Sequence, residues 1–189
     1  MKKRIIALAA LLFLTVGCVP AFAQQVAVST NIAQYLNFGT LNAEGSVSVA
    51  RHWTATAAAR YNPFSFRTHQ ADEKHINRKQ MTFSAGARYW PWHVYSGWWA
   101  GSRLQYQQYN NGGLVSPETS EGERYGLALS GGYTYMLSDR VNVEFGAAFW
   151  GGWGWYVTYD CPVCGLTMDK GKKFFVLPDE AIISLVYLF

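Results

Sequence analysis

The chain has 189 residues, of which 16 are basic and 12 acidic, giving a formal net charge of +4. Three of the basic residues lie at positions 2–4, so the rest of the chain is close to neutral and offers no clustered basic surface for nucleic acid. After the first 23 residues, no apolar run approaches the roughly 20 residues of a membrane-spanning helix. The chain nevertheless holds 8 Trp, 12 Tyr, 11 Phe and 18 Gly.

The N-terminal segment has the three parts of a secretory signal peptide. Basic residues are followed by a short apolar run and by the small-x-small motif Ala21-Phe22-Ala23. We expect cleavage after Ala23, which leaves residues 1–23 as the signal peptide and residues 24–189 as one domain. The alternative is lipoprotein processing at Cys18.

Alternation with a period of two indicates β-strands in the mature chain. It is clearest at 53–62, 79–89 and 124–135, where apolar residues alternate with small or polar ones. Five further segments repeat the pattern less cleanly, at 25–36, 41–50, 98–108, 140–153 and 181–189. Eight strands of about ten residues have the length of tilted membrane strands, and eight is the smallest common number for an outer-membrane barrel.

The connections between these segments alternate in length. The short ones are Arg51-His52, 91–97 and Ser138-Asp139, and the long polar ones are 63–77, 109–123 and 160–173. Short periplasmic turns and long outer loops are typical of outer-membrane barrels. The last segment ends in Phe189 and resembles the C-terminal signature that the barrel-assembly machinery reads.

These patterns predict an all-β fold, an eight-stranded antiparallel transmembrane β-barrel of the up-and-down type. We expect it in the outer membrane, in contact with outer-membrane lipid and lipopolysaccharide. The alternative fold is a soluble β-sandwich, which would hide the same apolar faces between two sheets.

Charged residues on the polar faces predict how the lumen is filled. They are Glu44, Arg60, Arg88, Arg103 and Glu144. Buried charges must be paired, and eight strands leave space only for side chains. We therefore expect a salt-bridged closed lumen in which the two glutamates pair with the three arginines. A gated ion path is the alternative.

The motif Cys161-Pro162-Val163-Cys164 lies in the last long connection. A CxxC pair can form a tight disulfide, half of a zinc site or a redox dithiol. We expect a disulfide that closes the loop, because the envelope is oxidising. A metal site would need further ligands, such as Asp160 or Asp169.

Tryptophans gather near both ends of the predicted strands. One group contains Trp53, Trp90, Trp92, Trp98 and Trp99, and the other contains Trp150, Trp153, Trp155 and Tyr156. Anchoring at the two membrane interfaces explains both groups. For Trp153, Trp155 and Tyr156 the alternative is a partner-binding surface, because aromatic residues dominate interface hot spots.

Enzymatic activity is the competing class of function. Ser65, His69 and Asp72 could form a nucleophile, a base and an orienting carboxylate, as in enzymes that modify lipid A or phospholipid. No spacing rule supports this arrangement, so we expect no catalytic residues and no cofactor.

Four strings of residues carry a resemblance to a known family. They are Arg51-His52-Trp53, Tyr61-Asn62-Pro63-Phe64, Ala87-Arg88-Tyr89-Trp90-Pro91 and the loop from Cys161 to Gly165. The chain resembles the DUF3575 family of Bacteroidales envelope proteins, which has no assigned activity. Its members are often encoded near fimbrial genes. The resemblance implies a non-enzymatic role in which the outer loops bind or anchor an envelope or fimbrial partner.

Overall fold

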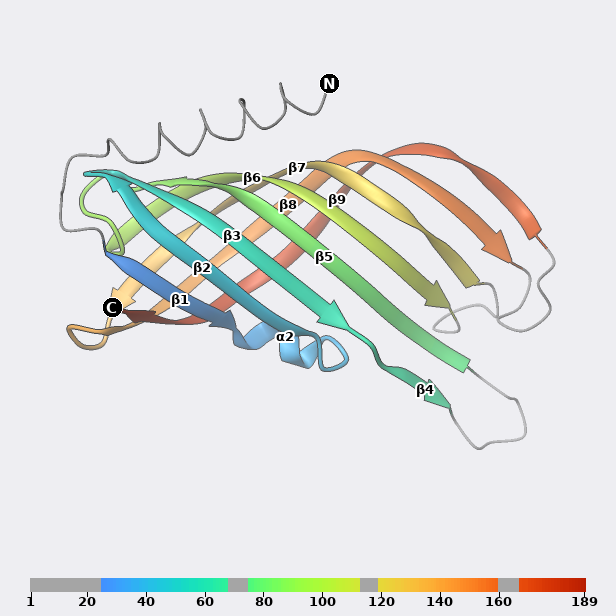
Figure 1. Ribbon diagram of the computed structural model, residues 1–189, viewed down its shortest axis with the longest axis horizontal. Coiled ribbons are helices and arrows are strands. Elements are labelled where there is room, and N and C mark those ends of the chain that lie inside the picture. The colour runs from blue at the N-terminus through green and yellow to red at the C-terminus, as the bar shows by residue number, and fades with distance from the viewer. Residues whose placement is uncertain (1–24, 68–74, 113–118, 160–166) are drawn as a thin grey trace, which may run out of the picture.

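The computed structural model describes residues 25–67, 75–112, 119–159 and 167–189, and this part of the chain is all-β apart from one short helix (Figure 1). In chain order the elements are β1 (Val26–Asn31), α2 (Ile32–Leu36), β2 (Leu41–Ala50), β3 (Trp53–Asn62), β4 (Ser65–Arg67), β5 (His75–Tyr89), β6 (Gly97–Gly112), β7 (Thr119–Met136), β8 (Val141–Tyr159) and β9 (Thr167–Leu188). No described helix has the length and hydropathy needed to cross a membrane.

Eight antiparallel strands form a ring. β1 pairs with β2 on one side and with β9 on the other, and β3 pairs directly with β5. The order β1-β2-β3-β5-β6-β7-β8-β9 therefore returns to its start, with consecutive strands adjacent. The three-residue β4 continues the line of β3 along β5. The prediction of an all-β fold with eight antiparallel strands is confirmed.

The strands are strongly staggered around this ring. One row of register partners runs from Val186 through Ser29, Glu44, Ala58, Ser84, Gln105, Gly126 and Gly152 to Phe175. The row thus returns to β9 at position 175 instead of 186, 11 residues from its start. For eight strands this stagger corresponds to a strand tilt of about 44°. The interior of such a barrel is just wide enough for side chains.

Alternate side chains divide the sheet into an inner and an outer face. On β8, Glu144 and Trp150 are buried, whereas Phe145 and Phe149 are exposed. The same alternation runs along β6 and β7. The inner face is filled mainly by polar and charged side chains, and the outer face carries most of the large apolar ones.

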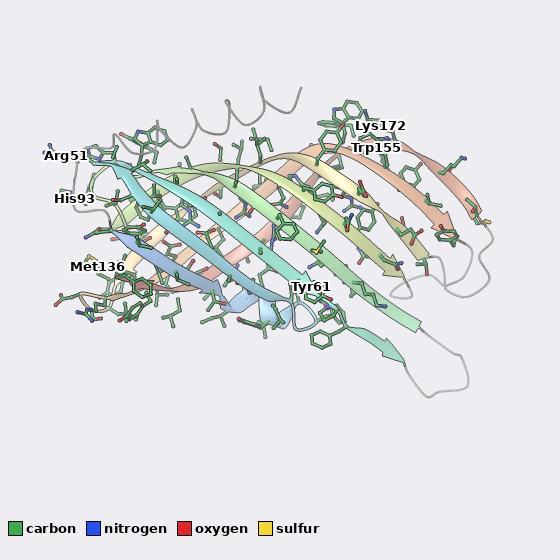
Figure 2. The ribbon with its side chains drawn as sticks, in the orientation of Figure 1. Arg51, Tyr61, His93, Met136, Trp155 and Lys172 are labelled. Carbon is green, nitrogen blue, oxygen red and sulfur yellow. The ribbon has the colours of Figure 1, made fainter. Side chains whose placement is uncertain are left out.

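The barrel has two unlike ends. At the turn end lie the short connections 51–52, 90–96 and 137–140, where Figure 2 shows Arg51, His93 and Met136 together. At the opposite, extended end, β5 to β9 run far beyond the ends of β1 to β3 (Figure 1). The sheet is therefore a closed ring near the turn end and an open, curved plate at the extended end.

The first predicted strand, 25–36, is wrong in its second half. β1 stops at Asn31, and residues 32–36 form α2. The Asn31 side chain accepts a hydrogen bond from the Ala33 amide at 3.1 Å, which caps the helix. The alternation of apolar residues carries no information about this local capping bond, so the predicted strand was too long.

The three long connections are also shorter than predicted. β5 begins at His75, β6 continues to Gly112, β7 begins at Thr119, and β9 begins at Thr167 instead of 181. Most of these extensions are polar, as in the register pair Asn110↔Glu121, although that of β9 also contains residues 174–177, which are apolar. Backbone pairing to a neighbour holds a strand whatever its side chains, so a hydrophobic pattern underestimates strands that leave the apolar band.

Paired glycines let the sheet curve tightly. Gly126 and Gly152 are register partners on the inner face. An added Cβ would meet the carbonyl oxygen of Gly151 or Tyr125 at 2.1 Å in each case. A side chain at either position would force the two backbones apart.

We expect Gly152→Ala to destabilise the barrel by about 1–3 kcal/mol, because the new methyl group overpacks against backbone. Gly45→Ala is the matched control, since a Cβ there meets nothing within 4 Å. Urea unfolding followed by tryptophan fluorescence measures both. Equal unfolding midpoints for the two variants would contradict the close approach at Gly152.

Candidate functional site: the charged lumen and the aromatic extended end

The first ion-pair group in the lumen centres on Arg88 of β5. Its guanidinium contacts Glu44 at 2.5 Å and Glu144 at 3.0 Å. Glu144 is buried and also accepts a hydrogen bond from the Thr134 hydroxyl at 3.2 Å. The Arg88 guanidinium lies 4.3 Å from the centroid of the Trp99 ring. One arginine thus joins β2, β5 and β8 across the interior.

The second group lies nearer the extended end. Arg60 contacts Asp179 at 3.1 Å, and Arg103 contacts the same carboxylate at 2.5 Å. Arg103 also pairs with Glu180. The Gln105 amide donates to Asp179 at 3.0 Å. These contacts tie β3 and β6 to β9.

The five predicted lumen residues therefore divide into two clusters. Glu44 and Glu144 both meet Arg88, but Arg60 and Arg103 meet Asp179 and Glu180, which the sequence analysis did not single out. Both acids lie in β9 next to Pro178, where the register with β8 shifts. That irregularity interrupts strict alternation, and alternation was the signal used. The one sequence signal that could have identified Asp179 and Glu180 is that two acidic residues stand side by side directly before the last predicted strand.

A cluster of aromatic side chains, here called the aromatic plug, fills the lumen toward the turn end. The connection 90–96 folds inward, and Trp90 is fully buried against Tyr95 and Trp99. The Trp90 indole donates to the Thr54 hydroxyl at 3.1 Å, and the Tyr95 carbonyl accepts from Asn142 at 2.9 Å. Burial raises the pKa of Tyr95, which keeps its hydroxyl neutral.

Little free space remains between the two ion-pair groups. A cavity of about 30 Å³ lies among Glu44, Arg60, Arg88, Arg103 and Glu180. This is room for about one water molecule. Within the described residues, no group of three or more His, Cys, Asp and Glu side chains is arranged to hold a metal ion.

The aromatic residues at the extended end form a compact exposed cluster. Trp153 and Trp155 face outward from β8, and the Lys172 ammonium lies 5.0 Å from the centroid of each ring. Figure 2 shows Lys172 beside Trp155. Tyr125 packs on Trp155, and Phe174 packs edge-on against Trp153. We call these five side chains the outer aromatic cluster.

Tyr156, the third predicted partner-binding aromatic, is not part of this cluster. It points to the other face of the sheet, where its hydroxyl donates to Asp169 at 2.9 Å. That hydrogen bond raises the pKa of Tyr156.

Several predicted residues lie outside the described part of the chain. They are the signal peptide with Cys18, His69, Asp72, Asp160, Cys161 and Cys164. The predictions that concern them stay predictions.

The sequence matches one known protein family. The family model of DUF3575, described as a protein of unknown function, matches residues 7–189. The chain belongs to the DUF3575 family. The match spans the whole barrel, including both ion-pair groups. No curated protein matches this DUF3575 member.

Removing the shared arginine should destabilise the DUF3575 barrel strongly. Arg88→Met leaves Glu44 and Glu144 buried without their cation, and breaking such a pair costs about 3–5 kcal/mol. Arg51→Met, at an exposed turn position, is the matched control and should change stability by less than about 0.5 kcal/mol. Urea unfolding compares the two. An Arg88→Met midpoint equal to that of the control would show that the lumen pairs are not needed.

Proposed function

We propose that this chain is a non-enzymatic outer-membrane barrel with a closed lumen, whose extended end binds or anchors an envelope partner. The observation that carries the membrane location is a pair of outward aromatic belts. Trp53 and Tyr61 are exposed on β3 and lie eight residues apart. Tyr125 and Tyr133 are exposed on β7 with the same spacing. On β8, Phe145 and Trp153 repeat this spacing.

The belt spacing matches a membrane. Eight residues span about 26 Å along a strand, or about 19 Å across the bilayer at a tilt near 45°. The rings themselves extend this to the apolar band of about 25 Å that outer-membrane barrels present. Exposed aliphatic side chains such as Leu104, Leu127 and Leu129 fill the interval between the belts.

The outer surface between the belts also has a shape suited to lipid chains. A hollow of about 750 Å³ opens outward over β2, β3, β5 and β6. Small side chains such as Ala43, Ala57 and Ala59 form its floor, and Phe83 and Leu104 border it. Outer-membrane lipid and lipopolysaccharide are the proposed occupants of this surface.

The filled lumen supports a binding role over transport. Two ion-pair groups, the aromatic plug and a remaining cavity of only about 30 Å³ support a closed lumen. The outer aromatic cluster, whose Tyr125 and Trp153 also belong to the belt nearer the extended end, lies at the proposed membrane boundary, where a partner could reach its exposed rings. Trp153, Trp155 and Tyr125 are of the residue types that dominate interface hot spots. The family resemblance adds a fimbrial component as a candidate partner.

The membrane location is testable by placing a charge in the band. Leu129→Arg should cost about 2–4 kcal/mol in lipid vesicles, because a cation near the bilayer midplane faces hydrocarbon. Ser138→Arg, in an exposed turn, is the control. Heat-dependent mobility of the folded chain from purified outer membranes gives the independent readout. A chain that fractionates with periplasmic protein, and tolerates both substitutions equally, would refute the proposal.

Partner binding is tested by cross-linking in intact envelopes. Trp153→Ala combined with Trp155→Ala should reduce recovery of envelope partners at least fivefold. Trp92→Ala, which removes an exposed tryptophan at the turn end, should leave recovery unchanged. Recovery of the barrel alone from unaltered envelopes would count against a partner.

A further inference from the structure

The inner face of the extended end carries an arginine that the lumen network does not use. Arg124 of β7 alternates with outward-facing Tyr125 and shares its face with buried Ala128. Its guanidinium lies 4.0 Å from the centroid of the Tyr109 ring and 5.5 Å from that of Phe175. It is only partly buried, so the side chain is accessible from the open side of the plate.

Glycines are the neighbours of Arg124 on three sides of this face, and Gln107 of β6 is its register partner on the fourth. Gly122 and Gly126 flank it along β7, and its register partner on β8 is Gly154. A Cβ at Gly154 would lie 2.9 Å from the Cγ of Arg124, so the arginine stem rests directly on that glycine. We call the backbone at Gly122, Gly126 and Gly154 the glycine floor. The Arg124 guanidinium lies above it, between the rings of Tyr109 and Phe175.

The carboxylates on the inner face are already engaged elsewhere. Glu44 and Glu144 pair with Arg88, and Asp179 and Glu180 pair with Arg60 and Arg103. Asp169 accepts the Tyr156 hydroxyl. Among the described residues, none of the ion pairs includes Arg124.

A second cation stands in the same register row. Lys173 of β9 is the partner of Gly154, which is itself the partner of Arg124. Two strand spacings, about 10 Å, therefore separate the two backbones across the glycine floor. Lys173 is exposed. Next to this row, Trp150 packs edge-on against Phe175, and its buried indole N–H has no hydrogen-bond partner among the described residues.

We propose that this floor, with Arg124, Lys173, Tyr109 and Phe175, is a binding site for an acidic saccharide. A guanidinium stacked on an aromatic ring keeps its planar N–H fork free for a carboxylate or phosphate. The glycine floor leaves room for a ring-shaped body, and the partly buried Phe175 offers apolar surface to the C–H face of a sugar, whereas the buried Tyr109 ring supports the guanidinium. An acidic peptide would need pockets for alternate side chains along a strand, which the glycine floor does not provide.

This site deepens the proposed partner-binding function, since it names the chemistry that the extended end would recognise. A uronic acid and a sugar phosphate share the required oxyanion on a ring. Both are therefore tested, and the stronger ligand identifies the source.

The experiment is isothermal titration of the purified, folded chain with glucuronate, glucose 6-phosphate, inorganic phosphate and glucose. We expect glucuronate or glucose 6-phosphate to bind more tightly than inorganic phosphate, and glucose to bind at least tenfold more weakly. Arg124→Gln should weaken the acidic sugar at least tenfold. Arg124→Lys should weaken it several-fold, because the charge remains but the fork is lost. Arg140→Gln, at the exposed turn end, should leave affinity unchanged.

Gly154→Ala gives a second, charge-neutral variant. The added methyl group displaces the Arg124 side chain, so affinity should fall several-fold while the net charge is constant. The unfolding midpoint of each variant, measured in parallel, separates loss of the site from loss of the fold.

Three results would overturn the proposal. They are no binding of either acidic sugar to the unaltered chain, equal affinity in Arg124→Gln, and equal affinity for inorganic phosphate and glucose 6-phosphate. The titration does not require a membrane, so a chain that binds acidic sugar but does not fractionate with outer membranes would refute the proposed location and leave this site standing.

Discussion

Closure of the sheet is the constraint on which the rest of the structure depends. Because β9 pairs with β1, each of the eight strands has a neighbour on both sides, and the ring has no free edge. Closure of eight strands with a stagger of 11 residues leaves an interior only as wide as side chains. The interior must therefore be filled from within, and every inward charge must find its partner there.

The lumen meets this requirement with two arginine-centred groups. Arg88 holds Glu44 and Glu144, and Asp179 joins Arg60 to Arg103. These contacts connect strands far apart in the ring, so the charges link opposite walls of the barrel while they fill its interior. Inward glycines have a different role at the extended end. They lie where neighbouring backbones approach too closely to leave space for a side chain. Because these glycines have no side chains, Arg124 remains accessible. The residues that let the sheet curve therefore also form the candidate binding surface.

The extended end differs from the ring in physical character. β1 to β3 stop early, whereas β5 to β9 continue as a polar, curved plate with aromatic clusters on both faces. Its outer face carries Trp153 and Trp155, and its inner face carries Arg124. The proposed membrane surface and the proposed recognition surfaces are thus built from the same strands, and the belt and the outer aromatic cluster share Tyr125 and Trp153.

Several features were predictable from the sequence alone because they depend on a local period. Alternation around Trp53, Met81 and Tyr125 determined strand identity, the number of ring strands and which face of each strand is apolar. The extra lengths of the strands were not predictable, since backbone pairing extends them through residues that do not alternate between apolar and polar. Only the tertiary structure decided which charges meet. The stagger of the ring brings residues from different strands to one height, and the register shift at Pro178 presents Asp179 and Glu180 to Arg60 and Arg103.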